Sequence, residues 1–500
     1  MSAEISPVAT RPLQADGPPR AIVLPSLAVI LLIATLLIRL PSFGDPNYHV
    51  DESFYLLFGE RMQAGAIPYQ DVWDRKPAGL FVLYWIFAAL GGLIPVHLAA
   101  MLVSWGTALC IARIAQTLAG GLAAGLAGIA YLAMQQVFHG GGGQAPVFYN
   151  CLMAAAALLT LRRLLGHSGL QAAYGAMLLC GLSLTIKPTT LFEGGLFGIC
   201  LVLCRYKDTA NLSAAARHAS ALMLIAAAPT LVILAAFAAT GHLATYWFAT
   251  IQSIFLVTPP PLEVQIGRTL QMALLSGLLL FCAAAGVLSR FRQHRGERVA
   301  LTFLAAWIAA GACAVFGLAN FHTHFMLSWL VPLSVAAGLY FDRARVGPLV
   351  GICVIAFPLV MAGPQLDRAR MSRATFDEAA TLIQPLLGGG CLFAFEAPPM
   401  LYQATQSCLP TSRLFPEHLN NGQEARATGL DATVEVRRIL ASRPSVIAMS
   451  RTSGVFDPNV STRGLISAAV GADYRRVGTF RFYEVSHWQD VDVYALKDVQ

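Results

Sequence analysis

Long apolar stretches separated by short polar turns dominate the first three quarters of the 500-residue chain. A helix needs roughly 17 to 25 apolar residues to cross the hydrocarbon core of a bilayer. Eleven stretches come close to this length or exceed it, and they predict membrane-spanning helices at 22–38, 97–112, 121–138, 145–161, 170–186, 188–204, 219–238, 269–289, 299–318, 325–341 and 347–363. No small-residue cleavage site follows the first stretch, so we expect an uncleaved anchor rather than a signal peptide.

A twelfth apolar stretch, residues 79–95, conflicts with this count. If it crossed the membrane, either the N-terminus or the acidic loop before it would change sides. Gly91 and Gly92 interrupt a helix, and Tyr84 and Trp85 are residues typical of the membrane–water interface. We therefore expect the stretch to lie at the outer interface, or to dip into the membrane and return.

Basic residues set the orientation of the predicted helices. Four arginines fall within residues 290–298, and the positive-inside rule places that loop in the cytoplasm. Counting helices from this loop makes residues 1–21 a cytoplasmic tail and puts loop 41–96 and residues 364–500 on the outer side. We therefore expect a bacterial cytoplasmic membrane protein with a periplasmic C-terminal domain.

Composition excludes an ordinary soluble enzyme, because 56% of the residues are hydrophobic and 12% are charged, against about 25% charged in soluble proteins. The net charge of +7 does not indicate nucleic-acid binding, since no basic run with interleaved aromatic residues accompanies it. Residues 22–363 form the expected membrane body. Residues 364–500 hold 14 of the 34 basic and 14 of the 27 acidic residues, which indicates a water-soluble part.

The C-terminal part alternates two helix-like stretches, 373–387 and 430–441, with short apolar stretches typical of strands. The predicted fold is therefore an all-α polytopic membrane body followed by a small α/β domain without a catalytic constellation of its own. That domain could cover a cavity, select an acceptor or only stabilise the body.

Acidic residues concentrate in one loop, since residues 41–78 carry six of the 13 acids in the first 363 residues. Within it, residues 49–65 predict a short amphipathic helix lying on the membrane, with Asp51 as its N-cap and Glu52 in its first turn. Asp51 and Glu52 are the candidate catalytic pair, and Tyr55 is a substrate-binding candidate. Capping and solvation alone are the alternative explanation for the acidic pair.

A second cluster begins the interfacial stretch and contains Trp73, Asp74, Arg75 and Lys76. Adjacent cations beside an apolar groove suit an amphiphile with an anionic head, such as a polyprenyl phosphate. Arg75 and Lys76 are therefore candidates for binding lipid phosphate, and Trp73 and Asp74 for binding substrate. Alternatively, the two cations only extend toward lipid headgroups.

Further candidates fall in other loops on the outer side. Lys187 lies between two predicted spans, where an ionisable group needs a partner or a water-lined cavity, and it could face a cavity or pair with Glu193. Gln144 follows a run of four glycines that is not a phosphate-binding P-loop, because it lacks the Gly-Lys-Ser/Thr ending. His322 and His324 occupy one turn, where they could bind substrate or only form interfacial hydrogen bonds.

Cysteine and histidine spacing gives no metal motif, since neither a Cys-x-x-Cys pair nor His-Glu-x-x-His occurs. No cofactor is expected with certainty, and a divalent metal remains an open alternative. Cys391 and Cys408 could form a disulfide if the C-terminal domain is extracytoplasmic.

Three motifs in this order resemble a known family: VDESFYLLFGERM at 50–62, WDRKPAGLFVLYW at 73–85 and TIKPT at 185–189. They are similar to the GT-C superfamily glycosyltransferases that use polyprenyl-phosphate sugars, in particular bacterial relatives of protein O-mannosyltransferases and of the lipid A aminoarabinose transferase. The resemblance covers roughly residues 20–345.

The resemblance implies that Asp51 is the general base on the acceptor and that Lys76 and Lys187 bind the lipid phosphate. His324 lies where many relatives have a histidine near the outer end of a late span. The sequence departs from the family at Arg75, where the aminoarabinose transferase has an acid, and at Gln144, where relatives often have Asp or Glu. The first departure weakens any transfer of a metal site from the family.

The expected function is therefore inverting transfer of a sugar from a polyprenyl-phosphate-linked donor to a lipid, glycan or protein acceptor, on the outer side of the membrane. A transporter or flippase, or a non-catalytic binder of a lipid-linked sugar, is the alternative. Charges gathered at one face without an evident internal repeat favour the enzyme over a transporter. Membrane lipids are expected partners, and nucleic acid is not.

Overall fold

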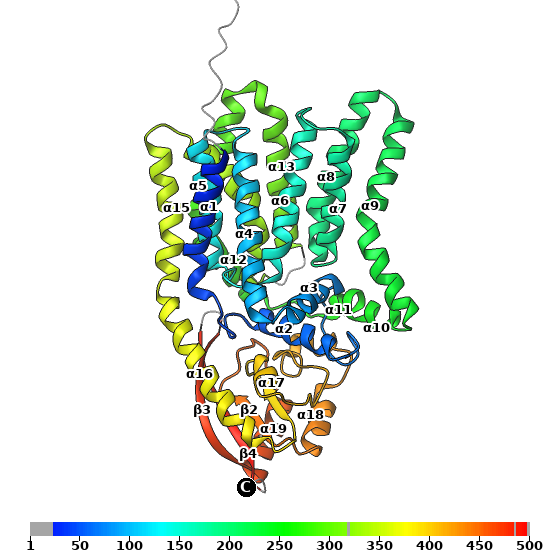
Figure 1. Cartoon of the computed structure of the whole chain (residues 1–500), viewed down its shortest axis with the longest axis vertical. Helices are drawn as coiled ribbons and strands as arrows, with labels where there is room; N and C mark the ends of the chain where they lie inside the picture. The colour runs from blue at the N-terminus through cyan, green and yellow to red at the C-terminus, as the bar shows by residue number, and fades with distance from the viewer. Residues whose placement is uncertain (1–23, 318–320, 485–486, 498–500) are drawn as a thin grey trace, which may run out of the picture.

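The computed structural model describes residues 24–317, 321–484 and 487–497, and it comprises a helical body with a small α/β domain at one end (Figure 1). The predicted cytoplasmic tail, residues 1–21, lies outside the described residues, as do the first two residues of the first predicted span.

Eleven described helices make up the bundle of the body, the number expected from the sequence. They are α1 (Leu24–Arg39), α4 (Leu93–Ala115), α5 (Gly121–Val137), α6 (Ala145–Leu164), α7 (Leu170–Leu184), α8 (Leu191–Thr209), α9 (Leu212–Ala239), α12 (Leu262–Gln293), α13 (Arg298–Phe316), α14 (Met326–Phe341) and α15 (Val346–Ala362). By length and composition, seven of these (α4, α6, α8, α9, α12, α13 and α14, some counted with an adjoining 3-10 turn) are able to cross a membrane. The other four are shorter apolar helices that run beside them (Figure 1).

Four short helices lie across the end of the bundle that faces the C-terminal domain (Figure 1). They are α2 (Val50–Gln63), α3 (Ala78–Ala89), α10 (Leu243–Trp247) and α11 (Ser253–Leu256). The 12 residues of α3 extend about 18 Å at 1.5 Å per residue, well short of the roughly 30 Å hydrocarbon core. The apolar stretch at 79–95 is thus a short helix across the bundle end, after which Gly91 and Gly92 turn the chain into α4.

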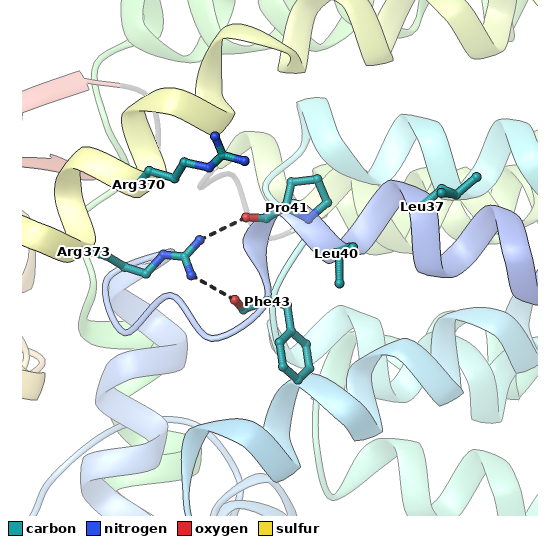
Figure 2. A pocket seen from close by; sticks show the side chains of 6 residues that line it. All are labelled: Leu37, Leu40, Pro41, Phe43, Arg370 and Arg373. Atoms are coloured by element: carbon teal, nitrogen blue, oxygen red, sulfur yellow. Dashed lines mark hydrogen bonds between the residues drawn. The ribbon is translucent and has the colours of Figure 1, made fainter.

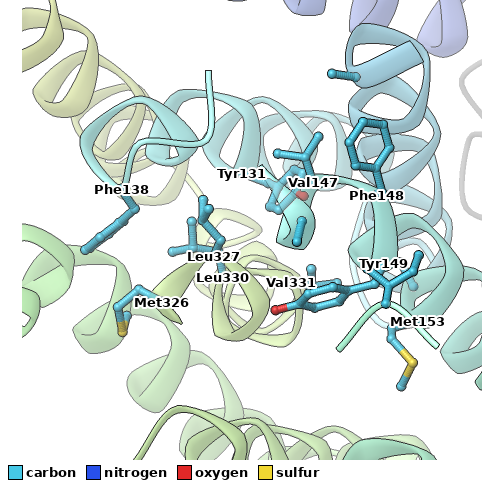
Figure 3. Close-up of a cluster of buried hydrophobic side chains, with 14 of the residues drawn as sticks. Tyr131, Phe138, Val147, Phe148, Tyr149, Met153, Met326, Leu327, Leu330 and Val331 are labelled. Carbon is cyan, nitrogen blue, oxygen red and sulfur yellow. The ribbon is translucent and has the colours of Figure 1, made fainter. Parts of the chain in front are cut away.

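The centre of the bundle is packed with aromatic and branched side chains from α5, α6 and α14 (Figure 3). Tyr131, Tyr149 and Leu330 are each no more than 2% exposed. At the edge of the bundle, α9 leaves side chains such as Leu224 and Val232 more than 60% exposed. Apolar surface of this kind is favourable against lipid chains and unfavourable against water, which agrees with a membrane body.

The C-terminal domain is built on a four-stranded mixed sheet of order β1-β2-β4-β3. Its elements are α16 (Pro364–Leu386), β1 (Leu392–Phe395), α17 (Met400–Ala404), α18 (Ala432–Ala441), β2 (Val446–Ser450), α19 (Val460–Asp473), β3 (Tyr474–Glu484) and β4 (His487–Leu496). β1 pairs with β2 in parallel, and β4 pairs antiparallel with both β2 and β3. A disulfide joins Cys391 to Cys408 at the start of β1.

Two predicted boundaries in this domain are wrong. The helix expected at 373–387 begins at Pro364. Only Gly363 separates it from the end of α15, so a nearly continuous helical rod links the membrane body to the sheet (Figure 1). The apolar stretch from Arg481 also predicts a strand, but β3 begins earlier, at Tyr474, because the adjacent Arg475 and Arg476 pair with β4 although they interrupt the apolar pattern.

Candidate active site

The first turn of α2 forms the centre of the candidate site. The predicted N-cap is wrong: His49 caps the helix, and its Nδ1 accepts a hydrogen bond of 3.1 Å from the backbone N–H of Asp51. The imidazole occupies the capping position because His49 adopts extended backbone angles while Asp51 is already helical. The carboxylate of Asp51 is therefore free of capping and available for other contacts.

The expectation that α2 is an amphipathic helix on the membrane surface is also wrong. Residues 51–59 are all buried, because α2 lies between α3 and the C-terminal domain. Phe54 contacts Phe415 of that domain, with the ring centroids 5.4 Å apart. The helix is covered on both sides, which explains why Asp51 is 7% and Glu52 1% exposed.

Lys76 joins the two clusters of the acidic loop. Its Nζ lies 3.6 Å from Oδ1 of Asp51 and 3.7 Å from Oδ2 of Asp74. The ammonium also lies 4.8 Å from the centre of the Tyr55 ring, a distance typical of a cation–π contact. Asp74 fixes the turn itself, because its Oδ1 accepts a 2.7 Å hydrogen bond from the backbone N–H of Lys76.

The electrostatic balance at this pair favours ionised side chains. Burial by itself would raise the pKa of Asp51, but the Lys76 ammonium and then the His49 imidazole outweigh it and hold that pKa well below its usual range. Burial would lower the pKa of Lys76, yet the carboxylates of Asp51 and Asp74 raise it. Both groups are charged at neutral pH, and the side chain of Lys76 is 21% exposed.

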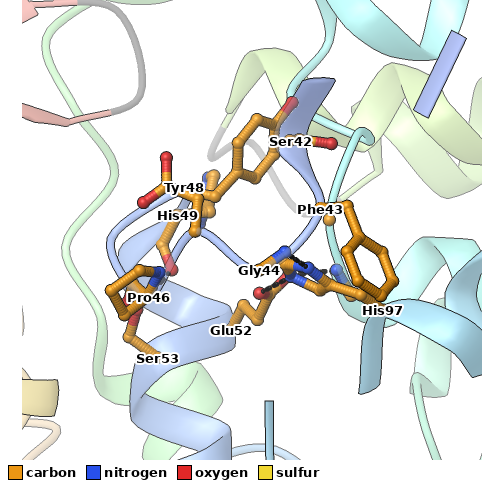
Figure 4. Close-up of polar contacts among 12 residues, drawn as sticks. Ser42, Phe43, Gly44, Pro46, Tyr48, His49, Glu52, Ser53 and His97 are labelled. Atoms are coloured by element: carbon orange, nitrogen blue, oxygen red, sulfur yellow. Dashed lines mark hydrogen bonds and ion pairs between the residues drawn. The ribbon is translucent and has the colours of Figure 1, made fainter. Parts of the chain in front are cut away.

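Glu52 points toward His97 and supports the loop before α2 (Figure 4). Its Oε1 lies 2.5 Å from Nε2 of His97, and its Oε2 accepts a hydrogen bond from the backbone N–H of Gly143. His97 in turn accepts a 2.7 Å hydrogen bond from the N–H of Gly44. This chain of contacts fixes the loop before α2 against α4.

The glycine run, residues 140–143, packs against side chains of the same loop. Arg39, which is 1% exposed, donates hydrogen bonds of 2.7 Å to the carbonyl oxygen of Gly140 and 2.6 Å to that of Gly142. A Cβ on Gly142 would overlap the Glu52 carboxylate. Glycine is needed here because the loop backbone and the buried acid approach one another too closely for a side chain.

Gln144, a substrate-binding candidate from the sequence, lies beside Asp51. Its Nε2 donates a 3.2 Å hydrogen bond to Oδ2 of Asp51 and lies 2.8 Å from Nε2 of His49. The amide is 1% exposed. Gln144 is therefore a neutral donor that orients the Asp51 carboxylate.

Lys187 approaches the site from the turn between α7 and α8. Its Nζ lies 4.5 Å from the centre of the Phe325 ring, and among the described residues it forms no ion pair or hydrogen bond. Burial and the nearby Lys76 lower the pKa of Lys187 to about 8. The alternative pairing with Glu193 does not occur, since Glu193 accepts a 2.6 Å hydrogen bond from Trp307.

The turn before α14 places His324 on the same side. Its ring lies 5.9 Å from that of His49 and 5.5 Å from that of His322, onto which it stacks. The two histidines lie together because the chain forms a 3-10 turn at Thr323–Phe325. Across the described ranges, no group of three or more His, Cys, Asp or Glu side chains is arranged to hold a metal ion.

The C-terminal domain contributes residues that the sequence analysis did not identify. Arg75, expected to bind lipid phosphate, forms a 2.6 Å ion pair with Glu424. Trp73, expected to bind substrate, is 1% exposed and packs against Arg413 and His418 of that domain. These contacts join the acidic loop to a segment far away in the sequence, so no local pattern could have revealed them.

The chain resembles known proteins in fold but not in sequence. No family model matches the sequence, and no curated protein matches it either. In fold, the chain is similar to ArnT from Cupriavidus metallidurans bound to undecaprenyl phosphate, with a TM-score of 0.62 and 13% identity, covering 94% of this chain and 98% of ArnT.

The oligosaccharyltransferase of Archaeoglobus fulgidus is also similar. The form solved with Zn and sulfate gives a TM-score of 0.55 at 13% identity, over 92% of this chain and 72% of that one. Its complex with an inhibitory peptide and a dolichol-phosphate gives 0.51 at 12% identity, over 95% and 74%. This chain therefore shares its fold with ArnT and with this oligosaccharyltransferase.

Proposed function

We propose that this protein is an integral-membrane glycosyltransferase that moves a sugar from a polyprenyl-phosphate-linked donor to an acceptor hydroxyl. The observation that carries the proposal is the meeting of Asp51, Lys76 and Lys187 at one end of the bundle, although they are far apart in sequence. Support comes from the fold neighbours, whose structures contain undecaprenyl phosphate in one case and a dolichol-phosphate in the other.

Two lysines suit the phosphate of such a donor. Lys187 is a cation without an anionic partner among the described residues, and Lys76 is partly exposed beside it. A phosphate between them would supply the missing counter-charge at Lys187 and would compete with Asp51 for Lys76. Fixed cations at this position also stabilise the charge that develops on the leaving phosphate.

Asp51 is the proposed general base. The acceptor oxygen attacks the anomeric carbon, the bond from that carbon to the phosphate oxygen breaks, and polyprenyl phosphate leaves with the electron pair. The acceptor proton passes to Asp51, a step worth about 10² to 10⁴ in rate. Because Lys76 is what holds the pKa of Asp51 down, movement of Lys76 toward the donor phosphate makes the carboxylate a stronger base.

A single displacement of this kind inverts the anomeric centre. Glu52, held by His97 and the glycine run, is proposed as a positioning residue for the helix that carries Asp51. Gln144 orients the Asp51 carboxylate from the other side. Tyr55 and His324 line the same region and are proposed to contact the sugar or the acceptor.

The outer face of the cytoplasmic membrane is the proposed location of the site. The arginines of 290–298 lie at the end of the bundle opposite the C-terminal domain (Figure 1), and the positive-inside rule assigns that end to the cytoplasm. The disulfide between Cys391 and Cys408 supports an oxidising compartment for the other end.

Binding of undecaprenyl phosphate by purified protein tests the proposal. The chain has only four lysines, and Lys207, at the far end of α8 from the site, offers a matched control. Lys76→Gln and Lys187→Gln are each expected to weaken binding at least tenfold, and Lys207→Gln is expected to leave it unchanged. Equal affinity in all three variants would remove the two lysines from the donor site.

Comparison of envelope glycolipids and glycoproteins by mass spectrometry, with and without the gene, then identifies donor and acceptor. If the protein is a transferase, deleting its gene leaves one sugar missing from a finished acceptor. If it is a flippase, the deletion instead leaves the lipid-linked sugar on the inner leaflet. Purified flippase supplied with donor and acceptor would also give no product.

A further inference from the structure

A second feature of the molecule lies where α1 ends and α16 begins (Figure 2). A pocket of about 410 Å³ is lined on one side by Leu37, Leu40 and Phe43, and on the other by Arg370 and Arg373. None of these residues belongs to the site around Asp51. The pocket therefore combines an apolar wall with two cations, a pairing that the proposed reaction does not use.

The apolar wall continues along α1 as an exposed stripe. Ile30, Ile33, Leu37 and Leu40 are spaced by three, four and three residues, so they share one face of the helix. They are 50%, 51%, 68% and 62% exposed. In a membrane this face meets the bilayer, and it leads directly to the two arginines.

Among the described residues, protein carboxylates balance the charges at the pocket only in part, through Asp367 beside Arg370 and Asp45 near Arg373. The side chain of Arg370 is 77% exposed, and its one ion pair within the described part of the chain is with Asp367, itself 86% exposed, at 3.9 Å. An exposed pair of this kind contributes little. Arg373 donates to the carbonyl oxygens of Pro41 and Phe43 at 3.3 and 3.2 Å, and its Nε is buried without a hydrogen-bond partner (Figure 2).

We infer that this pocket binds the headgroup phosphate of an anionic glycerophospholipid of the surrounding bilayer. The phosphodiester meets Arg370 and Arg373, and one acyl chain lies along the stripe on α1. Charge complementarity selects an anionic over a zwitterionic lipid, because a choline group would add a cation next to two arginines. The inference does not depend on the proposed transferase activity.

Binding of phosphatidylglycerol to full-length protein in phosphatidylcholine nanodiscs tests this inference. A basic residue near a membrane surface is worth about 1 kcal/mol toward anionic lipid, which corresponds to roughly fivefold in affinity. Arg370→Gln is expected to weaken phosphatidylglycerol binding about fivefold. Arg370→Lys keeps the charge and is expected to retain most of the affinity.

Arg437→Gln is the matched control, because Arg437 is an exposed arginine on α18 of the C-terminal domain, outside the pocket. It removes the same charge and is expected to leave binding unchanged. Equal affinity of Arg370→Gln and Arg437→Gln would overturn the inference. Displacement of phosphatidylglycerol by undecaprenyl phosphate would overturn it too, since the pocket would then belong to the donor.

Discussion

Asp51 and Asp74 hold the same lysine at nearly the same distance, which allows a direct test of which carboxylate does chemistry. Their oxygens lie 3.6 and 3.7 Å from Nζ of Lys76. At an effective dielectric constant of about 20, unit charges about 4 Å apart interact by about 4 kcal/mol. Asp51→Asn and Asp74→Asn therefore remove nearly equal electrostatic support from Lys76.

Any difference between the two variants then reports what Asp51 does beyond pairing with Lys76. A general base contributes about 10² to 10⁴ in rate, which is roughly 2.7 to 5.4 kcal/mol of transition-state stabilisation. We expect the turnover of Asp51→Asn to be lower than that of Asp74→Asn by this factor. Both variants should bind undecaprenyl phosphate with affinities within about fivefold of each other, because each keeps one carboxylate beside Lys76.

The assay is transfer from a polyprenyl-phosphate sugar by purified protein in vesicles, at saturating donor, with product measured by mass spectrometry. Asparagine keeps a side-chain oxygen that can accept from Gln144 at residue 51 and from the backbone at residue 74. Thermal melting of each variant establishes that it is folded. If Asp51→Asn and Asp74→Asn turn over equally, the carboxylate of Asp51 is only a counter-ion and the base lies elsewhere.

Four other variants or conditions test the remaining features. Glu52→Ala should lose about 3 to 5 kcal/mol of stability, because it leaves its buried partners unpaired, and a melting temperature within a degree of wild type would contradict this. Gly142→Ala should be similarly unstable or fail to accumulate, because its Cβ overlaps the Glu52 carboxylate; normal yield and melting would refute the close approach. The pKa of Lys187 is lowered to about 8, so Lys187 loses its proton as the pH rises from 7.5 to 9.5. In binding titrations the affinity for undecaprenyl phosphate should therefore fall over this range. The Lys187→Gln variant should show no such fall. Replacing Cys391 and Cys408 by serine should lower the free energy of unfolding by about 3 kcal/mol and should make the melting temperature independent of reductant. If the melting temperature of the wild type is also independent of reductant, the disulfide is absent.

The bundle was largely predictable because its physics is local. A bilayer demands long uninterrupted apolar helices, so the number of bundle helices and the break at Gly91 and Gly92 could be read directly from the sequence. The boundaries were less certain, since α12 begins at Leu262 rather than at 269. The first turns of α12 mix polar and apolar residues, so they do not extend the uninterrupted apolar stretch from which the span was predicted.

The candidate site was predictable only in part. Asp51, Lys76 and Lys187 were predicted to act together because their residue types and order resemble a family, and the structure places them near one another. His49 and Arg39 were missed because a buried histidine cap and a buried arginine leave no periodic signal. Arg39 binds Gln135 of α5 and the glycine run, about a hundred residues away, and His49 contacts Gln144, 95 residues away.

The ion pair between Arg75 and Glu424 has a consequence for biogenesis. Chains emerge from the ribosome N-terminus first, and their parts fold in that order. The segment that covers α2 is among the last to be synthesised, so the acidic loop stays uncovered until synthesis is almost complete. Prematurely terminated chains would insert a full set of helices yet expose ionised side chains beside lipid, a state that membrane proteases can recognise and remove.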